Sequence, residues 1–200
     1  MQKVAYNEQM ILTPKLKSAI RFSTKTHEID QKQKRKGKDI PYITHPLTVG
    51  LLLARAGANE DVIVAGILHD TVEDSIDAKK VTKEMITERF GDVVAGLVMS
   101  VTEQRKDLPW EERKREALEH VKTMDHDSLL VKAADLISNV SEIMSDYEKD
   151  GVATFDRFNA PREKVTWHYG EAMTTILRQW PEIPFAEDLT ALRGALNKIQ

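Results

Sequence analysis

The chain has 200 residues, of which 29 are lysine or arginine and 32 are aspartate or glutamate, so its formal net charge is −3. This length is that of about one globular domain, which disfavours an enzyme with two catalytic modules. There is no cysteine, so disulfides, thiolate metal sites and cysteine nucleophiles are excluded, and any metal site must use histidine and carboxylate ligands. The slightly acidic balance argues against nucleic acid as a partner.

The chain contains no apolar stretch that approaches the ~18 residues needed to span a bilayer. Its first residues lack the apolar core of a signal peptide. We therefore expect a cytoplasmic protein without membrane contact. A homo-oligomer is compatible with the sequence, which does not specify the oligomeric state.

Isolated glycines and prolines separate long stretches in which apolar and polar residues do not strictly alternate, which predicts an all-α fold. We expect a single domain, residues 1–200, whose motif-bearing core covers about 13–180. Thr13, followed by Pro14, is predicted to cap the first helix, and residues 44–46 to open the second in the same way. The second helix is predicted to end near Gly57.

Asn59 is predicted to cap a third helix, whose apolar residues run almost all the way round, as is typical of a buried helix. The remaining helices are expected at 82–90, which Gly91 ends, and at 92–102, 110–124, 127–149, 160–179 and 185–198.

The end of the third helix carries the most informative residues. His69 and Asp70 follow the apolar run directly, and Glu73 and Asp74 come one helical turn later. Burying unpaired imidazole and carboxylate groups is costly, whereas a divalent cation offsets their charge and takes their lone pairs. A solvated helix end is the alternative interpretation of these residues alone.

Two further residues are candidate partners for this group. His45 stands at a predicted helix start beside Pro46, although a packed or capping histidine would fit that position too. Asp135 interrupts an apolar helical stretch, where aspartate has poor intrinsic propensity. Lys132 and Asn139 share its helical face, so a local Lys132–Asp135 ion pair is the alternative there.

Together His45, His69, Asp70 and Asp135 match the charge of one divalent cation, and their order resembles that of the HD-domain phosphohydrolases. More closely, the chain resembles the hydrolase domain of the RelA/SpoT family, in the size of a stand-alone small alarmone hydrolase. The segments that carry this resemblance lie in the family's order at 34–37 (KRKG), 41–47 (PYITHPL), 65–74 (AGILHDTVED), 89–94 (RFGDVV), with Val98, Val101 and Thr102 behind it, and 132–135 (KAAD), with Asn139.

The resemblance implies that these four residues are metal ligands and that the ion is Mn²⁺. The ligand chemistry alone suits Mn²⁺, Fe²⁺ or Zn²⁺. In the family, the pair that corresponds to Glu73 and Asp74 performs acid–base and water-orienting work, and a helix continuing for one more turn would place both carboxylates above the ligands. An acidic cap on the following loop is the alternative for this pair.

A basic segment, residues 31–38, has five lysines or arginines in eight residues. A solvated loop, a nucleic-acid patch and an electropositive rim for a phosphorylated small molecule are its three interpretations. The resemblance favours the last, with a nucleotide as the small-molecule substrate. It assigns substrate binding to Arg35 and Lys36, to Asn139 at the nucleotide's sugar, and to Arg162 at a distal phosphate.

The chain also departs from the family. Long members place arginine and histidine where this chain has Leu136 and Ser138, which puts the base preference in doubt. The segment 108–114 (LPWEERK) looks like the short hydrolases instead, with Arg113 and Lys114 either facing phosphate or lying on a solvated helix. No segment has the length of the family's synthetase.

The resemblance thus implies a Mn²⁺-dependent hydrolase that removes the 3′-pyrophosphate of the guanosine alarmone (p)ppGpp. The alternatives are the same chemistry on an adenosine alarmone (ppApp) or on NADPH, and a non-catalytic alarmone-binding regulator. Outside these motifs, His27 is expected to be packed or on the surface, and His120 and His126 to lie on the surface. The aromatic cluster 167–169 (WHY) is expected to make a core or subunit contact, with Tyr169 a candidate for the border of the pocket.

Overall fold

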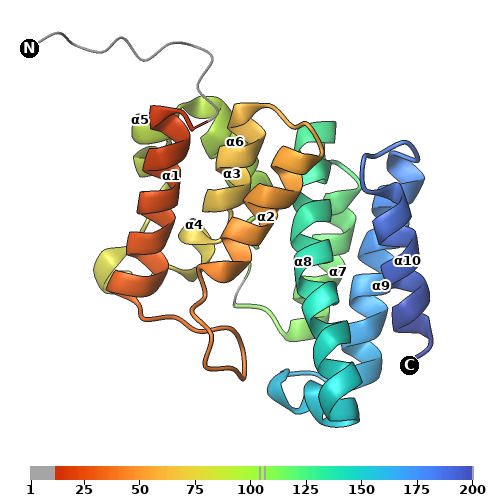
Figure 1. Ribbon diagram of the computed structural model, residues 1–200. Coiled ribbons are helices and arrows are strands. Elements are labelled where there is room, and N and C mark those ends of the chain that lie inside the picture. The colour runs from red at the N-terminus through yellow and green to blue at the C-terminus, as the bar shows by residue number, and fades with distance from the viewer. Residues whose placement is uncertain (1–11, 104, 106, 200) are drawn as a thin grey trace, which may run out of the picture.

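The protein is described by a computed structural model for residues 12–103, 105 and 107–199, and every regular element in this part of the chain is helical (Figure 1). The prediction of a single all-α domain is therefore confirmed. The α-helices are α1 (Pro14–Thr24), α2 (Thr44–Arg55), α3 (Glu60–Leu68), α4 (Thr71–Asp74), α5 (Lys83–Phe90), α6 (Asp92–Val101), α7 (Trp110–Val121), α8 (His126–Asp150), α9 (Arg162–Gln179) and α10 (Ala186–Asn197). A π-helix, η1 (Lys25–Asp30), and two 3₁₀ helices, η2 (Asp77–Lys79) and η3 (Gly151–Arg157), complete the set.

The long helix α8 runs through the middle of the bundle, with α2, α3 and α6 packed on one side and α9 and α10 on the other (Figure 1). The apolar residues of α3 from Val62 to Leu68 are buried, except for the partly buried Ile63, as the sequence pattern predicts. Two glycines let α2 and α3 cross closely. A Cβ at Gly66 would lie 2.3 Å from a Leu53 methyl carbon, and one at Gly50 would lie 2.6 Å from Ile67. This close crossing brings the start of α2 next to the end of α3.

The predicted caps are confirmed at two helices and wrong at a third. Thr13 accepts a hydrogen bond from the amide of Leu16, and Asn59 accepts one from the amide of Val62. Thr44, however, is the first residue of α2 and not its cap, because Ile43 already has helical backbone angles. The Thr44 hydroxyl donates to the carbonyl of Pro41 instead.

The helix that leads to the His-Asp pair ends just before it. Helix α3 ends at Leu68, the chain turns at His69 and Asp70, and the single turn α4 begins at Thr71. The amide of Asp74 donates to the carbonyl of Asp70 at 2.9 Å, so helical hydrogen bonding resumes after the turn. The turn aims His69 and Asp70 at α2 and α8 rather than along one face of α3.

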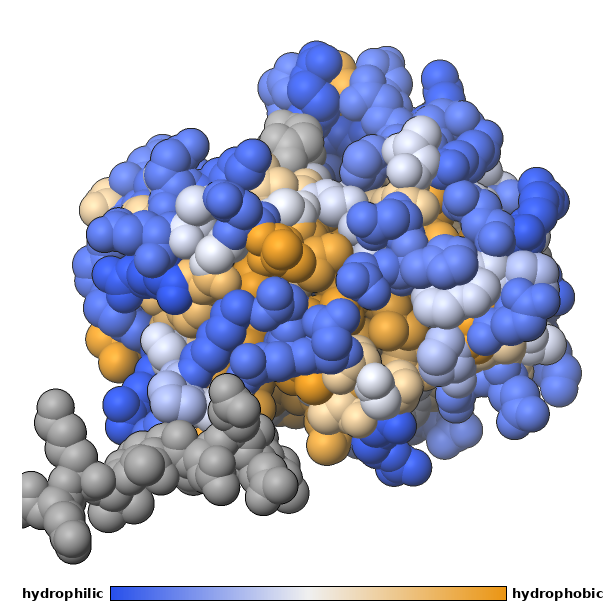
Figure 2. Space-filling view, turned by 90° about the horizontal axis from the view of Figure 1, so that it is seen from above, coloured by the Kyte–Doolittle hydropathy of each residue, from blue (hydrophilic) through white to orange (hydrophobic). Residues whose placement is uncertain are grey.

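The face seen in Figure 2 is mainly polar around its edge, and apolar residues appear in its middle. Within the described residues, none of the helices has both the length and the apolar character that a bilayer span requires.

Candidate metal centre and substrate cavity

Four side chains from three places in the chain meet at the centre of the bundle. His45 comes from the first turn of α2, His69 and Asp70 from the turn between α3 and α4, and Asp135 from the middle of α8. The Nε2 atoms of His45 and His69 lie 3.2 Å apart. The Asp70 carboxylate lies 3.0 Å from His69 Nε2 and 3.5 Å from His45 Nε2. The Asp135 carboxylate lies 3.3 Å from His45 Nε2 and 3.8 Å from His69 Nε2.

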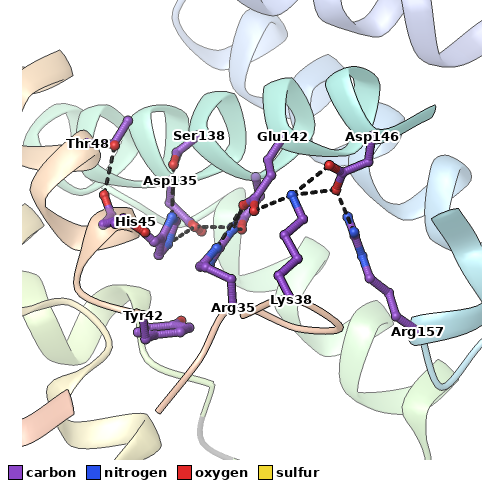
Figure 3. Close-up of polar contacts among 12 residues, drawn as sticks. Arg35, Lys38, Tyr42, His45, Thr48, Asp135, Ser138, Glu142, Asp146 and Arg157 are labelled. Carbon is purple, nitrogen blue, oxygen red and sulfur yellow. Dashed lines mark hydrogen bonds and ion pairs between the residues drawn. The ribbon is translucent and has the colours of Figure 1, made fainter. Parts of the chain in front are cut away.

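The separations among His45, His69 and Asp70 fit a shared cation, and in the described part of the chain these three side chains form the close group of candidate ligands, with Asp135 slightly further out. Ligand atoms at about 2.0–2.2 Å from one ion are about 3–3.6 Å from each other at octahedral or tetrahedral angles. His69 Nδ1 donates to the carbonyl of Gly66 at 2.8 Å, which leaves its Nε2 with the lone pair that a metal needs. His45 Nδ1 is likewise engaged, at 2.9 Å from Ser138 Oγ (Figure 3). Both imidazoles therefore direct Nε2 to the same point.

The carboxylates are also held by neighbouring side chains. The Tyr42 hydroxyl donates to Asp70 at 2.6 Å. Lys132 Nζ donates to one oxygen of Asp135 at 2.9 Å, and Asn139 donates to the other at 2.6 Å. Such outer partners fix the orientation of metal-binding groups.

The electrostatics of this group favour negative carboxylates and a positive centre. His45 is 3% exposed, His69 4% and Asp135 9%. Burial opposes charge on His69, but the carboxylates of Asp70 and Asp135 outweigh it and raise its pKa to about 9. Burial raises the pKa of Asp135, yet Lys132 and the two histidines hold it well below its usual range. The group therefore favours positive charge, which either a proton on His69 or a divalent cation in its place supplies.

A cavity of about 740 Å³ opens over this group, a volume in the usual range for small-molecule sites. Its walls include His45, His69, Asp70 and Asp135, together with Glu73 from α4. Glu73 accepts a hydrogen bond from the amide of Glu103 at 2.9 Å. A carboxylate next to the four converging side chains is suitably placed for acid–base work.

Asp74 does not line the cavity and is held behind it. It accepts a hydrogen bond from Gln33 Nε2 at 2.8 Å, and Gln33 Oε1 lies 2.7 Å from Nδ1 of His27. His27 is fully buried on the π-helix η1, in line with the expectation that it is packed. Gln33 itself lines the cavity, so Asp74 is coupled to the site through the basic segment.

The basic segment lies against α8 and forms ion pairs with its acidic side chains (Figure 3). Arg35 donates to Asn139 at 2.9 Å and to Glu142 at 2.8 Å, and its guanidinium lies 5.4 Å from the centre of the Tyr42 ring. Lys38 pairs with Glu142 at 2.7 Å and with Asp146 at 2.6 Å, and Arg157 of η3 also pairs with Asp146. Arg35, predicted to bind substrate, thus has its charge matched by acids of α8.

Three further cations line the cavity, and two of them also have acidic partners, Arg157 in Asp146 and Lys114 in Glu103. Lys36 comes from the basic segment, Lys114 from α7 and Arg157 from η3, and all three line the cavity. Burial, Arg157 and Lys114 together lower the pKa of Lys36, which shows that the three charges are close to one another. Close positive charges of this kind suit a polyphosphate.

Of the substrate residues that the sequence predicts, Arg35, Lys36 and Asn139 line the cavity and Arg162 does not. The Arg162 guanidinium pairs with the neighbouring Glu163 at 2.9 Å instead. Arg157, which lines the cavity, was not predicted, because nothing in its local sequence separates it from a surface arginine. Lys132 was predicted as a candidate ion-pair partner of Asp135 and as part of the KAAD segment, and this pair is present at 2.9 Å; Tyr42 was noted only as part of the PYITHPL motif.

A helical bundle in which one histidine, a His-Asp pair and a later aspartate converge is typical of HD-domain proteins. A family model of the HD domain matches residues 19–160, and the chain belongs to the HD-domain family.

Among curated proteins, the chain is 36% identical over 133 residues to guanosine-3′,5′-bis(diphosphate) 3′-pyrophosphohydrolase MESH1 of Danio rerio, covering 66% of this chain and 70% of that protein. It is 34% identical over 130 residues to the Homo sapiens protein of the same name, covering 64% and 69%. A GTP pyrophosphokinase of Myxococcus xanthus matches 92% of this chain at 36% identity, but only 24% of its own length. The resemblance to short, stand-alone members of the family is therefore confirmed.

Two solved structures share the fold. One, described as a metazoan ortholog of SpoT that hydrolyses ppGpp, superposes with a TM-score of 0.74 at 21% identity and covers 94% of this chain and 98% of its own. The other, a crystal structure of a Listeria monocytogenes protein, has a TM-score of 0.69 at 32% identity and covers 77% and 99%.

Proposed function

We propose that this protein is a Mn²⁺-dependent (p)ppGpp 3′-pyrophosphohydrolase. The observation that carries the proposal is the convergence of His45, His69, Asp70 and Asp135, at 3.0–3.8 Å, on one wall of a nucleotide-sized cavity. Two relatives, each matched by this chain over more than two thirds of its length, are named guanosine-3′,5′-bis(diphosphate) 3′-pyrophosphohydrolase. Their family membership supports the reaction, and the mixed imidazole and carboxylate ligands support Mn²⁺ as one of the ions that suit them.

The reaction replaces one phosphorus–oxygen bond by another. A water molecule attacks the phosphorus nearest the ribose O3′, the bond to O3′ breaks, that oxygen takes up a proton, and pyrophosphate leaves as one unit. A divalent cation held by the four residues would polarise the phosphoryl oxygens and lower the pKa of water. Because Glu73 lines the cavity next to these residues, we assign to it the transfer of the water proton.

Asp74 has a different role in this proposal from that of Glu73. It is bound to Gln33 and lies behind the cavity wall, so it positions the basic segment and acts on the reaction through Gln33. Asn139 supports Asp135 and lines the cavity, and we assign to it the contact with the sugar. The three cations Lys36, Lys114 and Arg157 balance the phosphate charge. Arg35 fixes the basic segment over the site.

The experiment that tests this function measures pyrophosphate release from ppGpp by purified protein, with added Mn²⁺ and with a chelator. Parallel reactions contain ppApp, NADPH and a simple phosphomonoester. Release from ppGpp that requires the metal supports the substrate, the bond and the metal together. Release only from ppApp, or phosphate release only from NADPH, retains the site chemistry and contradicts the guanosine substrate. Binding of ppGpp without turnover in any metal contradicts the enzyme and supports a regulator.

A further inference from the structure

The chain from Gln33 to Ile43, which includes most of the basic segment, is tied to the π-helix η1 at both ends. The carbonyl of His27 accepts a hydrogen bond from the amide of Gln33 at 2.8 Å, and the Glu28 carboxylate accepts one from the amide of Ile43 at 2.9 Å. Between η1 and Gln33 the chain passes through Lys32, whose φ of 51° is uncommon for a residue other than glycine. Such a conformation persists where surrounding contacts hold it, so the path from η1 into the basic segment is fixed.

The His27 side chain adds a second bond at the same place. Its Nδ1 lies 2.7 Å from Gln33 Oε1, and Gln33 Nε2 donates to Asp74 at 2.8 Å. Because the amide nitrogen of Gln33 faces Asp74, its oxygen faces His27, and His27 Nδ1 is the donor. His27 Nε2 is buried and has no hydrogen-bond partner within the described residues, so a hydrogen there would be costly. The contacts therefore select the tautomer that carries its hydrogen on Nδ1.

Gln33 is thus held at both polar atoms of its amide, by a histidine of η1 and an aspartate of α4. It also lines the cavity, shortly before Arg35 and Lys36, the residues assigned to substrate binding. A side chain that is fixed at both ends fixes the start of the segment that follows it, as supporting contacts do for binding residues in general.

Packing alone does not account for a histidine at position 27. The ring lies 4.9 Å from the ring of Tyr42, a contact that an apolar ring would make as well. A buried imidazole carries a desolvation cost that an apolar ring avoids. The hydrogen bond to Gln33 is what the imidazole provides and an apolar ring does not.

We propose that His27 is a positioning residue, which holds the Gln33 amide against Asp74 and so keeps the basic segment in place for the substrate. His27 acts through Gln33, because it does not itself line the cavity. The proposal rests on the proposed function in that the ligand of the segment is the hydrolysed nucleotide. It places a determinant of substrate affinity in η1, outside the cavity.

Nuclear magnetic resonance of the imidazole nitrogens tests the His27–Gln33 bond without turnover. The two tautomers of a neutral imidazole differ in their nitrogen shifts, and His27→Asn identifies the His27 signals by their loss. We expect the Nδ1–H tautomer in the wild type, and a shift of its Nδ1 signal in Gln33→Met, which removes the acceptor. An Nε2–H tautomer in the wild type, or His27 signals that Gln33→Met leaves unchanged, overturns the proposal.

Kinetics with the hydrolysed nucleotide test whether this bond acts on the substrate. His27→Phe keeps a ring against Tyr42 but removes the donor. A hydrogen bond typically contributes about three- to tenfold, so His27→Phe is expected to raise KM by about that factor with little change in kcat. His27→Asn, whose amide nitrogen replaces Nδ1 as the donor, is expected to restore KM. A loss of folded protein would lower kcat and leave KM unchanged.

The matched control is Ser23→Ala. Ser23 is fully buried four residues before His27, and its hydroxyl has no hydrogen-bond partner in the part of the chain that the structure describes. We expect it to leave KM and kcat unchanged. An unchanged KM in His27→Phe, or a KM raised equally by Ser23→Ala, overturns the positioning role.

A combined variant tests whether His27 acts through Gln33. Gln33→Met alone is expected to raise KM at least as much as His27→Phe, because Gln33 lines the cavity. Adding His27→Phe to Gln33→Met is then expected to have no further effect, whereas independent residues would give additive changes. Additive increases in KM overturn the proposal.

The two proposals can fail separately. Hydrolysis with an unchanged KM in His27→Phe overturns the positioning role and leaves the enzyme standing. An Nδ1–H tautomer that depends on Gln33, in a wild type that hydrolyses no nucleotide, supports the placement of Gln33 by His27 and contradicts the proposed function.

Discussion

His69 and His168 border the same cavity, yet their surroundings shift their pKa values in opposite directions. His69 lies among Asp70 and Asp135, whose charges overcome burial and raise its pKa to about 9. His168 lies near Lys114 and Lys132, whose charges add to burial and lower its pKa to about 3. The cavity therefore has two electrostatic ends, with positive charge favoured at the candidate metal centre and an uncharged ring favoured where α7 packs on α9.

Lys132 lies between the two ends and takes part in both. Its ammonium group donates to Asp135, and its charge also lowers the pKa of His168. Asp135 in turn raises the pKa of His168, but by less than the lysines lower it. A change at Lys132 or Asp135 should therefore alter the difference between the pKa values of His69 and His168.

The largest effect is expected from Asp135→Ala, which removes one of the four converging groups and leaves Lys132 without its acidic partner. Bound metal and pyrophosphate release should both be lost, and His69→Ala should do the same. Metal content and activity on ppGpp are the measurements. Asp127→Ala, an exposed position on the same helix, is the matched control. Full activity in Asp135→Ala would contradict its assignment as a ligand.

A loss confined to the chemical step is expected from Glu73→Gln. The amide keeps the size of the side chain but cannot take a proton from water, so kcat should fall by about 10²–10⁴-fold while the metal remains bound. Single-turnover hydrolysis and metal content together measure this split. Loss of metal along with activity would instead make Glu73 a ligand.

A smaller effect is expected from Lys132→Met, because this residue orients Asp135 and does not itself bind metal. Outer partners of this kind typically contribute about 10–100-fold to activity, and kcat/KM should fall within that range. Lys132→Arg keeps the charge and the donor and should restore most of the activity. Equal losses in both variants would point to packing rather than charge as the cause.

The smallest effect concerns stability and pH. His168 has a folded pKa of about 3, below the usual value of 6.5, so the unfolded chain binds its proton more readily. The stability that neutral His168 provides is complete above pH 6.5 and is lost as the pH falls towards 3. Urea unfolding at pH 7 and at pH 5 should show a larger decrease in the free energy of unfolding for the wild type than for His168→Gln. An identical decrease would contradict the assigned environment.

The two ends of the cavity also differ in how far the sequence predicts them. His69 and Asp70 could be found from the sequence because they directly follow an apolar helix, and Asp135 because it interrupts one, where a polar group needs a partner. His45 stands at a helix start, and its assignment came from the order that resembles the HD-domain proteins. Thr13 and Asn59 were predicted as caps for an equally local reason, since a helix start needs a side chain that accepts its amides.

The contact between Trp110 and His168 could not be predicted in the same way. Trp110 and His168 lie 58 positions apart in the chain and meet only because α7 packs on α9. Each also fits an ordinary core position. The prediction for Arg162 fails for a related reason, since a neighbouring acid takes its guanidinium, and sequence spacing does not show which of two nearby arginines faces the cavity.

The helical class, most helix ends and the polar residues of the candidate metal centre can be predicted from the sequence, because they follow from local periodicity and from the cost of burying polar groups. The tertiary structure alone decided the turn after Leu68, the pairing of Arg35 with Glu142, and the separation of Asp74 from the cavity. These depend on contacts between segments far apart in the chain, which are set by how the helices pack and not by any one of them.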